Sequence, residues 1–91
     1  MGSSGFALTE SGEAYAWGEN GLGNLGLGDT EDRLTPTKVP GLAGVKAIAA
    51  RYYQSFALTE FGEVYAWGRN DKGQLGLGDT EDRLTPTRMP F

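Results

Sequence analysis

Carboxylates are the side chains of this 91-residue sequence best suited to chemistry, and six of the twelve gather in one short run that occurs twice. The six residues are Asp29, Glu31 and Asp32, and then Asp79, Glu81 and Asp82. Such a cluster could bind Ca²⁺ or supply a carboxylate pair for hydrolysis. The run lacks the twelve-residue ligand loop of an EF-hand, and Arg33 beside it can neutralise charge. We therefore expect a solvated loop in which Asp29 bonds to its own turn backbone, and no metal site.

A glycine-rich motif directly before this run has the spacing of a dinucleotide-binding fingerprint. Residues 21–26 read GLGNLG, which satisfies G-x-G-x-x-G. That fingerprint needs a following helix whose N-terminus meets the pyrophosphate, and no helical pattern follows here. The second copy of the motif has Asp71 in place of its first glycine. The motif therefore predicts tight turns, and no cofactor is expected.

The sequence contains neither histidine nor cysteine. The commonest general base, the commonest zinc ligand and thiolate chemistry are therefore missing. The hydroxyls of Ser55 and Thr9 have no histidine to activate them, so nucleophilic catalysis is not expected. We predict a protein that is not an enzyme and has no catalytic residues.

The net charge of -4 and a pI of about 4.6 limit the classes of partner. Sequence-independent nucleic-acid binding needs clustered Lys and Arg, and the sequence has no basic run. No apolar run reaches the roughly 18–20 residues of a membrane span. Residues 1–5 (MGSSG) lack the apolar segment of a signal peptide and are interpreted as a leader. Localisation stays open, with the cytoplasm expected if the chain is expressed as it stands.

A tandem repeat organises the elements that position these residues. Residues 6–40 align with residues 56–90 over 35 positions, of which eight differ and 27 are identical. Identity this high indicates recent duplication or deliberate engineering. Within one repeat, FALTE and EAYAW flank Ser11-Gly12, the spacing of a tight hairpin. LTPTKV predicts an edge strand because Pro36 lacks a backbone donor, and VKAIAA predicts a short inner strand.

The second repeat resembles a known family. Residues 56–90, FALTEFGEVYAWGRNDKGQLGLGDTEDRLTPTRMP, are similar to the repeat of the regulator of chromosome condensation family, whose core reads G-x-(V/I)-(Y/W)-x-W-G-x-N-x-x-G-Q-L-G-x-G. The resemblance covers residues 6–91 and implies blades of a β-propeller, which in the family usually number seven. Three departures stand out: fewer than two full repeats are present, Gln54 replaces the usual His, and Arg51 replaces a nearby Gly.

The expected fold is all-β, with two antiparallel four-stranded propeller-type blades per chain. The first blade should lack its innermost strand, because nothing before Phe6 corresponds to Val45–Ala50. The expected division is a leader at 1–5, a three-stranded first repeat at 6–40 and a four-stranded second repeat at 41–91. Two blades leave large apolar faces in water, which predicts self-association into a multi-chain β assembly. Three chains would give six blades and four would give eight; a strand-swapped, rearranged β dimer is the alternative fold.

Two sets of residues are expected to carry the function. The blade core and blade interface should contain the apolar and aromatic residues Tyr15, Trp17, Tyr65, Trp67, Leu25, Leu75 and Ile48. Tyr52, Tyr53 and Gln54 fall before a strand, where propellers usually present binding residues, and are candidate ligand or partner contacts. The predicted function is a non-catalytic structural and interaction module that binds copies of itself, and another protein is the second expected partner. The alternatives are a protein-binding domain of a guanine-nucleotide-exchange or chromatin-associated propeller, as the resemblance implies, and a lectin-like repeat binder.

Overall fold

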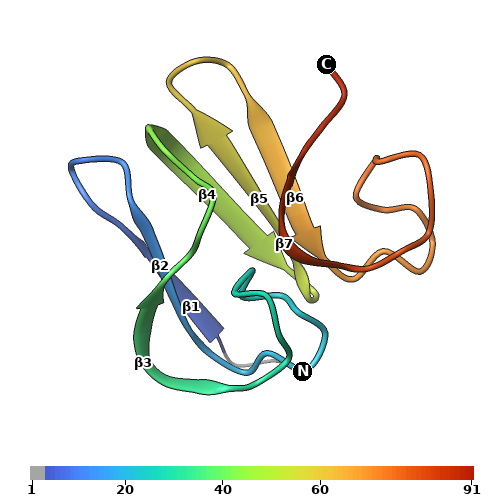
Figure 1. The fold of residues 1–91 in the computed structure, drawn as a ribbon, viewed down its shortest axis with the longest axis horizontal. Helices are drawn as coiled ribbons and strands as arrows, with labels where there is room; N and C mark the ends of the chain where they lie inside the picture. Colours follow the sequence, from blue (N-terminus) through green and yellow to red (C-terminus); the bar gives the residue numbers. More distant parts are fainter. Residues whose placement is uncertain (1–3) are drawn as a thin grey trace.

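The computed structural model describes residues 4–91 and places them in two antiparallel sheets, shown in Figure 1. The first sheet has three strands in the order β1-β2-β3: β1 (Ser4–Leu8), β2 (Ala14–Gly18) and β3 (Arg33–Lys38). The second sheet has four strands in the order β4-β5-β6-β7: β4 (Val45–Arg51), β5 (Gln54–Thr59), β6 (Val64–Gly68) and β7 (Arg83–Arg88). The expectation of an all-β chain with two blades, one with three strands and one with four, is confirmed.

The first strand begins earlier than the sequence indicates. Ser4 and Gly5, which we interpreted as part of the leader, pair with Gly18 and Trp17 in the first sheet. Residues 1–3 lie outside the described part of the chain. Among residues 4–91 there is no helix with the length and apolarity that a membrane span requires.

The hairpins are wider than the predicted two-residue turn at Ser11-Gly12. Leu8 pairs with Ala14, so the connection between β1 and β2 spans residues 9–13. Thr9 determines this width: its N–H donates to the Glu13 carbonyl at 2.9 Å, and its Oγ1 accepts the Glu13 N–H at 3.0 Å. These two bonds close a longer turn, which Gly12 completes at a φ of +83°.

The proline-containing strands lie at sheet edges, as predicted. Pro36 is in β3 and Pro86 in β7, each the last strand of its sheet. Ala16 pairs with Thr37 and Gly18 with Arg33, so Trp17 faces a three-residue irregular segment, Leu34 to Pro36. Pro lacks the N–H that a regular ladder would use, which permits this irregularity. The same irregularity recurs opposite Trp67 in the second sheet.

The core consists of two buried clusters that are joined by side chains packed against both. The first cluster contains Ala14, Ala16, Leu25 and Val39, and the second contains Val45, Ala57 and Trp67. Three partly buried side chains, Phe6, Leu42 and Ile48, pack against both clusters. A hydrogen bond from the Val45 N–H to the Gly12 carbonyl, at 3.1 Å, joins the start of β4 to the first hairpin. The two sheets therefore pack as neighbouring blades.

Candidate protein-interaction surfaces

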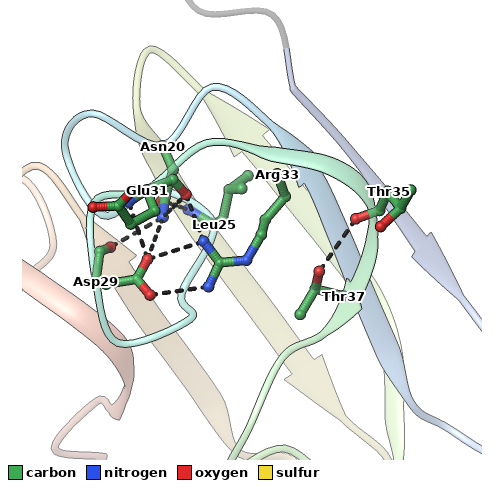
Figure 2. Close-up of polar contacts among 7 residues, drawn as sticks. All are labelled: Asn20, Leu25, Asp29, Glu31, Arg33, Thr35 and Thr37. Atoms are coloured by element: carbon green, nitrogen blue, oxygen red, sulfur yellow. Dashed lines mark hydrogen bonds and ion pairs between the residues drawn. The ribbon is translucent and has the colours of Figure 1, made fainter.

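A buried asparagine organises the loop that joins the last two strands of each blade. In the first loop (residues 19–32), Asn20 Nδ2 donates to the carbonyls of Asp29 and Glu31, both at 3.0 Å, while Asn20 Oδ1 accepts the Leu25 N–H at 2.9 Å (Figure 2). The second loop (residues 69–82) repeats these bonds around Asn70 at 2.9–3.1 Å. Both asparagines are fully buried. Each loop is therefore held in shape by its own residues.

The acidic cluster takes part in the same hydrogen-bond network within the loop. Asp29 Oδ1 accepts the Glu31 N–H at 3.0 Å, and Asp29 Oδ2 pairs with Arg33 at 2.9 Å (Figure 2). The hydrogen bond from Arg33 is the main cause that lowers the pKa of the Asp29 carboxyl below its usual value. Asp32 Oδ1 accepts the Asn20 N–H at 2.9 Å. Residues 4–91 contain no group of three or more Cys, Asp or Glu placed to hold a metal ion. The carboxylates stabilise the loop by accepting its donors.

The first loop covers one face of the second sheet, and we call this contact the seam. The Asn24 carbonyl oxygen accepts two hydrogen bonds there, from Ser55 Oγ at 2.9 Å and from Trp67 Nε1 at 3.0 Å. The Gly28 N–H donates to the Leu84 carbonyl at 2.9 Å. The Phe6 ring meets the Trp67 ring edge-on at a centroid distance of 6.1 Å. The seam therefore combines an aromatic contact, in which Trp67 is buried, with hydrogen bonds to main-chain carbonyls.

Glycines allow the first loop to approach the second sheet this closely. A Cβ on Gly26 would lie 2.8 Å from Trp67 Nε1, and a Cβ on Gly23 would overlap the Leu84 side chain. Both glycines also have positive φ, +78° and +72°. The glycines of the G-x-G-x-x-G motif thus form turns, and they let the backbone of the loop contact the second sheet.

Among residues 4–91 nothing covers the corresponding face of the first sheet, and we call it the open face: Gly5, Trp17, Leu34 and Thr35. The Leu34 side chain is 98% exposed, whereas its equivalent Leu84 is 39% exposed. Trp67 is 0% exposed, whereas Trp17 is only partly buried. A Cβ on Gly5 would lie 2.5 Å from the Trp17 ring, so this ring lies directly over Gly5. Trp67 cannot lie over Ser55 in the same way, because Ser55 has a Cβ.

The second loop has the converse property, because no sheet of the described chain lies under it. Gly76 is exposed, whereas its equivalent Gly26 is buried. No described residue donates to the Gln74 carbonyl oxygen, the counterpart of the doubly bonded Asn24 carbonyl. The Gln74 side chain bonds within its own loop, accepting from the Lys72 N–H at 2.7 Å and donating to Asp71 at 3.1 Å. One chain therefore presents one uncovered sheet face and one unused loop.

The predicted contact residues Tyr52, Tyr53 and Gln54 lie together at the turn between β4 and β5. Tyr52 and Tyr53 both adopt positive φ, +50° and +70°, in a two-residue turn closed by the Arg51–Gln54 pair. Bulky residues seldom occupy that region, so the turn is strained. Tyr52 is 75% exposed, with the Arg51 guanidinium 5.3 Å from its ring centroid. The turn borders a hollow of about 290 Å³ beside Asn24, whose buried Oδ1 has no hydrogen-bond partner among the described residues.

The expected core residues differ in their surroundings. Leu25, Leu75 and Trp67 are fully buried, and the remaining four are partly buried: Tyr15, Trp17, Tyr65 and Ile48. Sequence reasoning missed Asn20 and Asn70, although the spacing W-G-x-N occurs unchanged in both repeats and would have indicated them. It also missed Leu34. Residues 25–37 and 75–87 are identical, so the sequence does not show that Leu84 is covered and Leu34 is not.

Known proteins contain the same repeat and the same blade arrangement. The family model of the regulator of chromosome condensation (RCC1) repeat matches residues 11–58 and 62–91, and a second model with that description matches residues 45–74. The fold is similar to that of human WBSCR16, with a TM-score of 0.84 and 29% identity over 98% of this chain and 24% of that one. Yeast RCC1 (Prp20), in a structure bound to Kap60, gives a TM-score of 0.83 and 32% identity over 97% of this chain and 21% of that one.

Curated relatives match over shorter segments. Ras guanine nucleotide exchange factor C of Dictyostelium discoideum is 70% identical over 33 residues, which are 36% of this chain and 2% of that protein. The ultraviolet-B receptor UVR8 of Arabidopsis thaliana is 50% identical over 40 residues, which are 44% of this chain and 9% of that protein. This chain thus spans less than a tenth of either relative and about a quarter of the similar solved structures. Because the family model matches most of its residues, the chain belongs to the regulator of chromosome condensation repeat family, as a β-propeller fragment.

Proposed function

We propose that this chain is a non-catalytic interaction module whose partner is another copy of itself. The observation that carries the proposal is the difference between Leu34, 98% exposed, and Leu84, 39% exposed, in repeats of nearly identical sequence. Leu34 lies on a face whose twin in the same chain is covered. A partner that covers the open face would complete the arrangement already present at the seam.

The energetic argument follows from the size of the chain. Domains of this length bury a modest fraction of their surface and are only marginally stable alone. Burying a leucine side chain contributes about 1.5–3 kcal/mol, and the open face offers Trp17 as well as Leu34. Repeat proteins gain much of their stability from contacts between neighbouring units, and here one unit lacks a neighbour on its open face. Self-association would therefore stabilise the fold of each chain as well as join the chains to one another.

The absence of catalysis is part of the same proposal. The sequence has no histidine or cysteine, and the carboxylates Asp29 and Asp32 accept hydrogen bonds from their own loop. These carboxylates act in the folding of their own loop, and we assign them no role toward a substrate. The chemistry of the chain is that of a binding surface.

Sedimentation equilibrium tests the proposal, at protein concentrations from about 1 to 500 μM. We expect a weight-average mass well above the 9.7 kDa of one chain, rising with concentration. Circular dichroism measured on the same samples shows whether the chain is folded. A folded species of 9.7 kDa across the whole range would contradict self-association.

Binding to a different protein is the second candidate function. It is favoured by the similar solved structures, one of which shows yeast RCC1 (Prp20) bound to Kap60, and by the exchange-factor relative. The test is whether the chain accelerates nucleotide release from a small GTPase. We expect no acceleration, because the chain spans 21% of Prp20 and 2% of the exchange factor. A dose-dependent acceleration would favour the second function over the first.

A further inference from the structure

We propose that copies associate head to tail, with the second loop of one copy seated on the open face of the next. The inference rests on the proposed self-association and adds its geometry. The template is the seam, where the first loop sits on the second sheet of the same chain through Asn24, Gly26 and Gly28. The intermolecular contact repeats the seam with every residue number shifted by fifty.

The second loop has the shape that the seam requires. Residues 25–37 and 75–87 are identical in sequence. The glycines that contact the sheet have nearly equal φ in the two loops: +72°, +78° and +91° at Gly23, Gly26 and Gly28, and +73°, +74° and +90° at Gly73, Gly76 and Gly78. Because its own asparagine fixes each loop, the second loop keeps this shape without a sheet beneath it. It is therefore preorganised for binding.

The open face carries the matching groups. Trp17 Nε1 corresponds to Trp67 Nε1, so it is placed to donate to the Gln74 carbonyl of the incoming loop. Leu34 corresponds to Leu84, so its carbonyl is placed to accept the Gly78 N–H and its side chain to pack on Gly73. The replacement of Asn24 by Gln74 is compatible with this contact, because the acceptor is a main-chain oxygen.

Two side chains of the isolated chain move on docking. The Met89 side chain lies against Gly76, where a Cβ would be 2.9 Å from its Cε, and it gives way to Trp17 of the next copy. The Trp17 ring, which lies over Gly5, moves into the place that Trp67 occupies at the seam. Phe56 of the incoming copy then meets Trp17 as Phe6 meets Trp67. Gly5 offers no hydroxyl where Ser55 donates at 2.9 Å, and the first sheet has no equivalent of β4 to repeat the bond from Val45 to Gly12, so the intermolecular contact lacks these two hydrogen bonds.

A head-to-tail contact has a characteristic consequence. The loop and the face are different surfaces, so the interface is heterologous, and every dimer retains one free loop and one free face. Association continues until a ring closes or a chain of copies extends. Two variants, each with one surface disabled, would therefore be complementary to each other.

The face is disabled by Leu34→Glu and the loop by Gly73→Asn. Leu34 is almost fully exposed, so a carboxylate there leaves the single chain intact but faces the acidic second loop of a partner. Asparagine tolerates positive φ, and a Cβ at Gly73 meets nothing closer than the Asp79 carbonyl at 3.7 Å. At the equivalent Gly23 a Cβ would overlap Leu84. Gly73→Asn should therefore clash with Leu34 of the next copy.

Sedimentation velocity on the full chain gives the decisive readout. Each variant alone should associate at least tenfold more weakly than the parent, since each loses the burial of a leucine side chain. An equimolar mixture should form a dimer that contains one copy of each variant and does not grow further. The control variants, Gly41→Asn for backbone conformation and Phe61→Glu for removal of an exposed apolar side chain, should associate like the parent.

The outcomes separate the two proposals. A parent chain that stays monomeric contradicts self-association itself. A parent that associates, with variants that associate equally well, contradicts the head-to-tail geometry but leaves self-association standing. Variants that are each monomeric and remain so when mixed also contradict it, because a heterologous interface must be rescued by mixing. Equal weakening by Phe61→Glu would indicate unspecific hydrophobic association and overturn the inference.

Discussion

The two repeats have nearly the same sequence but different surroundings. Trp67 is fully buried under the first loop, whereas Trp17, its equivalent, is partly exposed and lies over Gly5. Leu84 packs on Gly23, whereas Leu34 is 98% exposed. How much a residue stabilises this chain therefore depends on its contacts with the neighbouring repeat as much as on contacts within its own repeat. Substitutions made in pairs, one in each repeat, test that difference directly.

The largest expected effect separates the two tryptophans. Trp67→Ala should lower the free energy of unfolding by about 3–5 kcal/mol, because it removes a buried ring and its hydrogen bond to Asn24. Trp17→Ala should cost about 1 kcal/mol or less in the monomeric Leu34→Glu background, where no partner covers the ring. Urea unfolding followed by circular dichroism measures both. Equal losses of unfolding free energy in the two variants would show that burial at the seam does not determine how much each tryptophan stabilises the chain.

The buried asparagines should behave alike, in contrast to the tryptophans. Asn20→Ala and Asn70→Ala each leave several loop donors and acceptors unpaired, including the Leu25 or Leu75 N–H. We expect each variant to lose about 1–3 kcal/mol of unfolding free energy, since the loss lies within one loop. The same urea titrations give the values. A difference of more than about 1 kcal/mol between the two would mean that the seam supports one loop more than the other.

A single serine should make the open face more like its covered twin. Gly5→Ser restores the hydroxyl found at Ser55 and adds a Cβ where the Trp17 ring lies. We expect the dissociation constant of self-association to fall by roughly 3- to 10-fold, the value of one net hydrogen bond. Sedimentation equilibrium measures the change, with Gly5→Ala as the control that displaces the ring but adds no donor. Weaker association of Gly5→Ser than of Gly5→Ala would contradict the expected hydrogen bond.

The smallest expected effect is the pH dependence that Asp71 adds to the second loop. Hydrogen bonds from Arg69 and then Gln74 lower the pKa of Asp71 from 3.8 to about 2, and the first loop has Gly21 at this position. Because the folded value lies below the unfolded value, this stabilisation is complete above about pH 4. It is lost as the pH falls through about 2. An NMR titration of the Asp71 carboxyl carbon in the Leu34→Glu monomer reports the value directly. A pKa near 3.8 would contradict the ion pair with Arg69.

The sequence predicted the fold to the extent that local patterns determine it. Alternating apolar residues, glycine-containing turns and Pro36 predict hairpins and edge strands, whereas the two blades were inferred from the tandem repeat and its resemblance to a known family. The width of the hairpins was missed because it depends on side-chain and backbone bonds of Thr9 that no pattern encodes. The strained Tyr52-Tyr53 turn was missed for a similar reason, since bulky residues are rare at positive φ. The contrast between Leu34 and Leu84 lies outside any single-repeat pattern, because it arises from the neighbour.

The acceptor at the centre of the seam is a main-chain carbonyl, that of Asn24. A main-chain acceptor is present whatever side chain occupies the position, and the second repeat already has Gln74 there. Neighbouring repeats can therefore diverge at this site without a compensating change in the partner repeat. A repeat that is duplicated or exchanged between chains would therefore keep this acceptor, whatever residue it carries at the position.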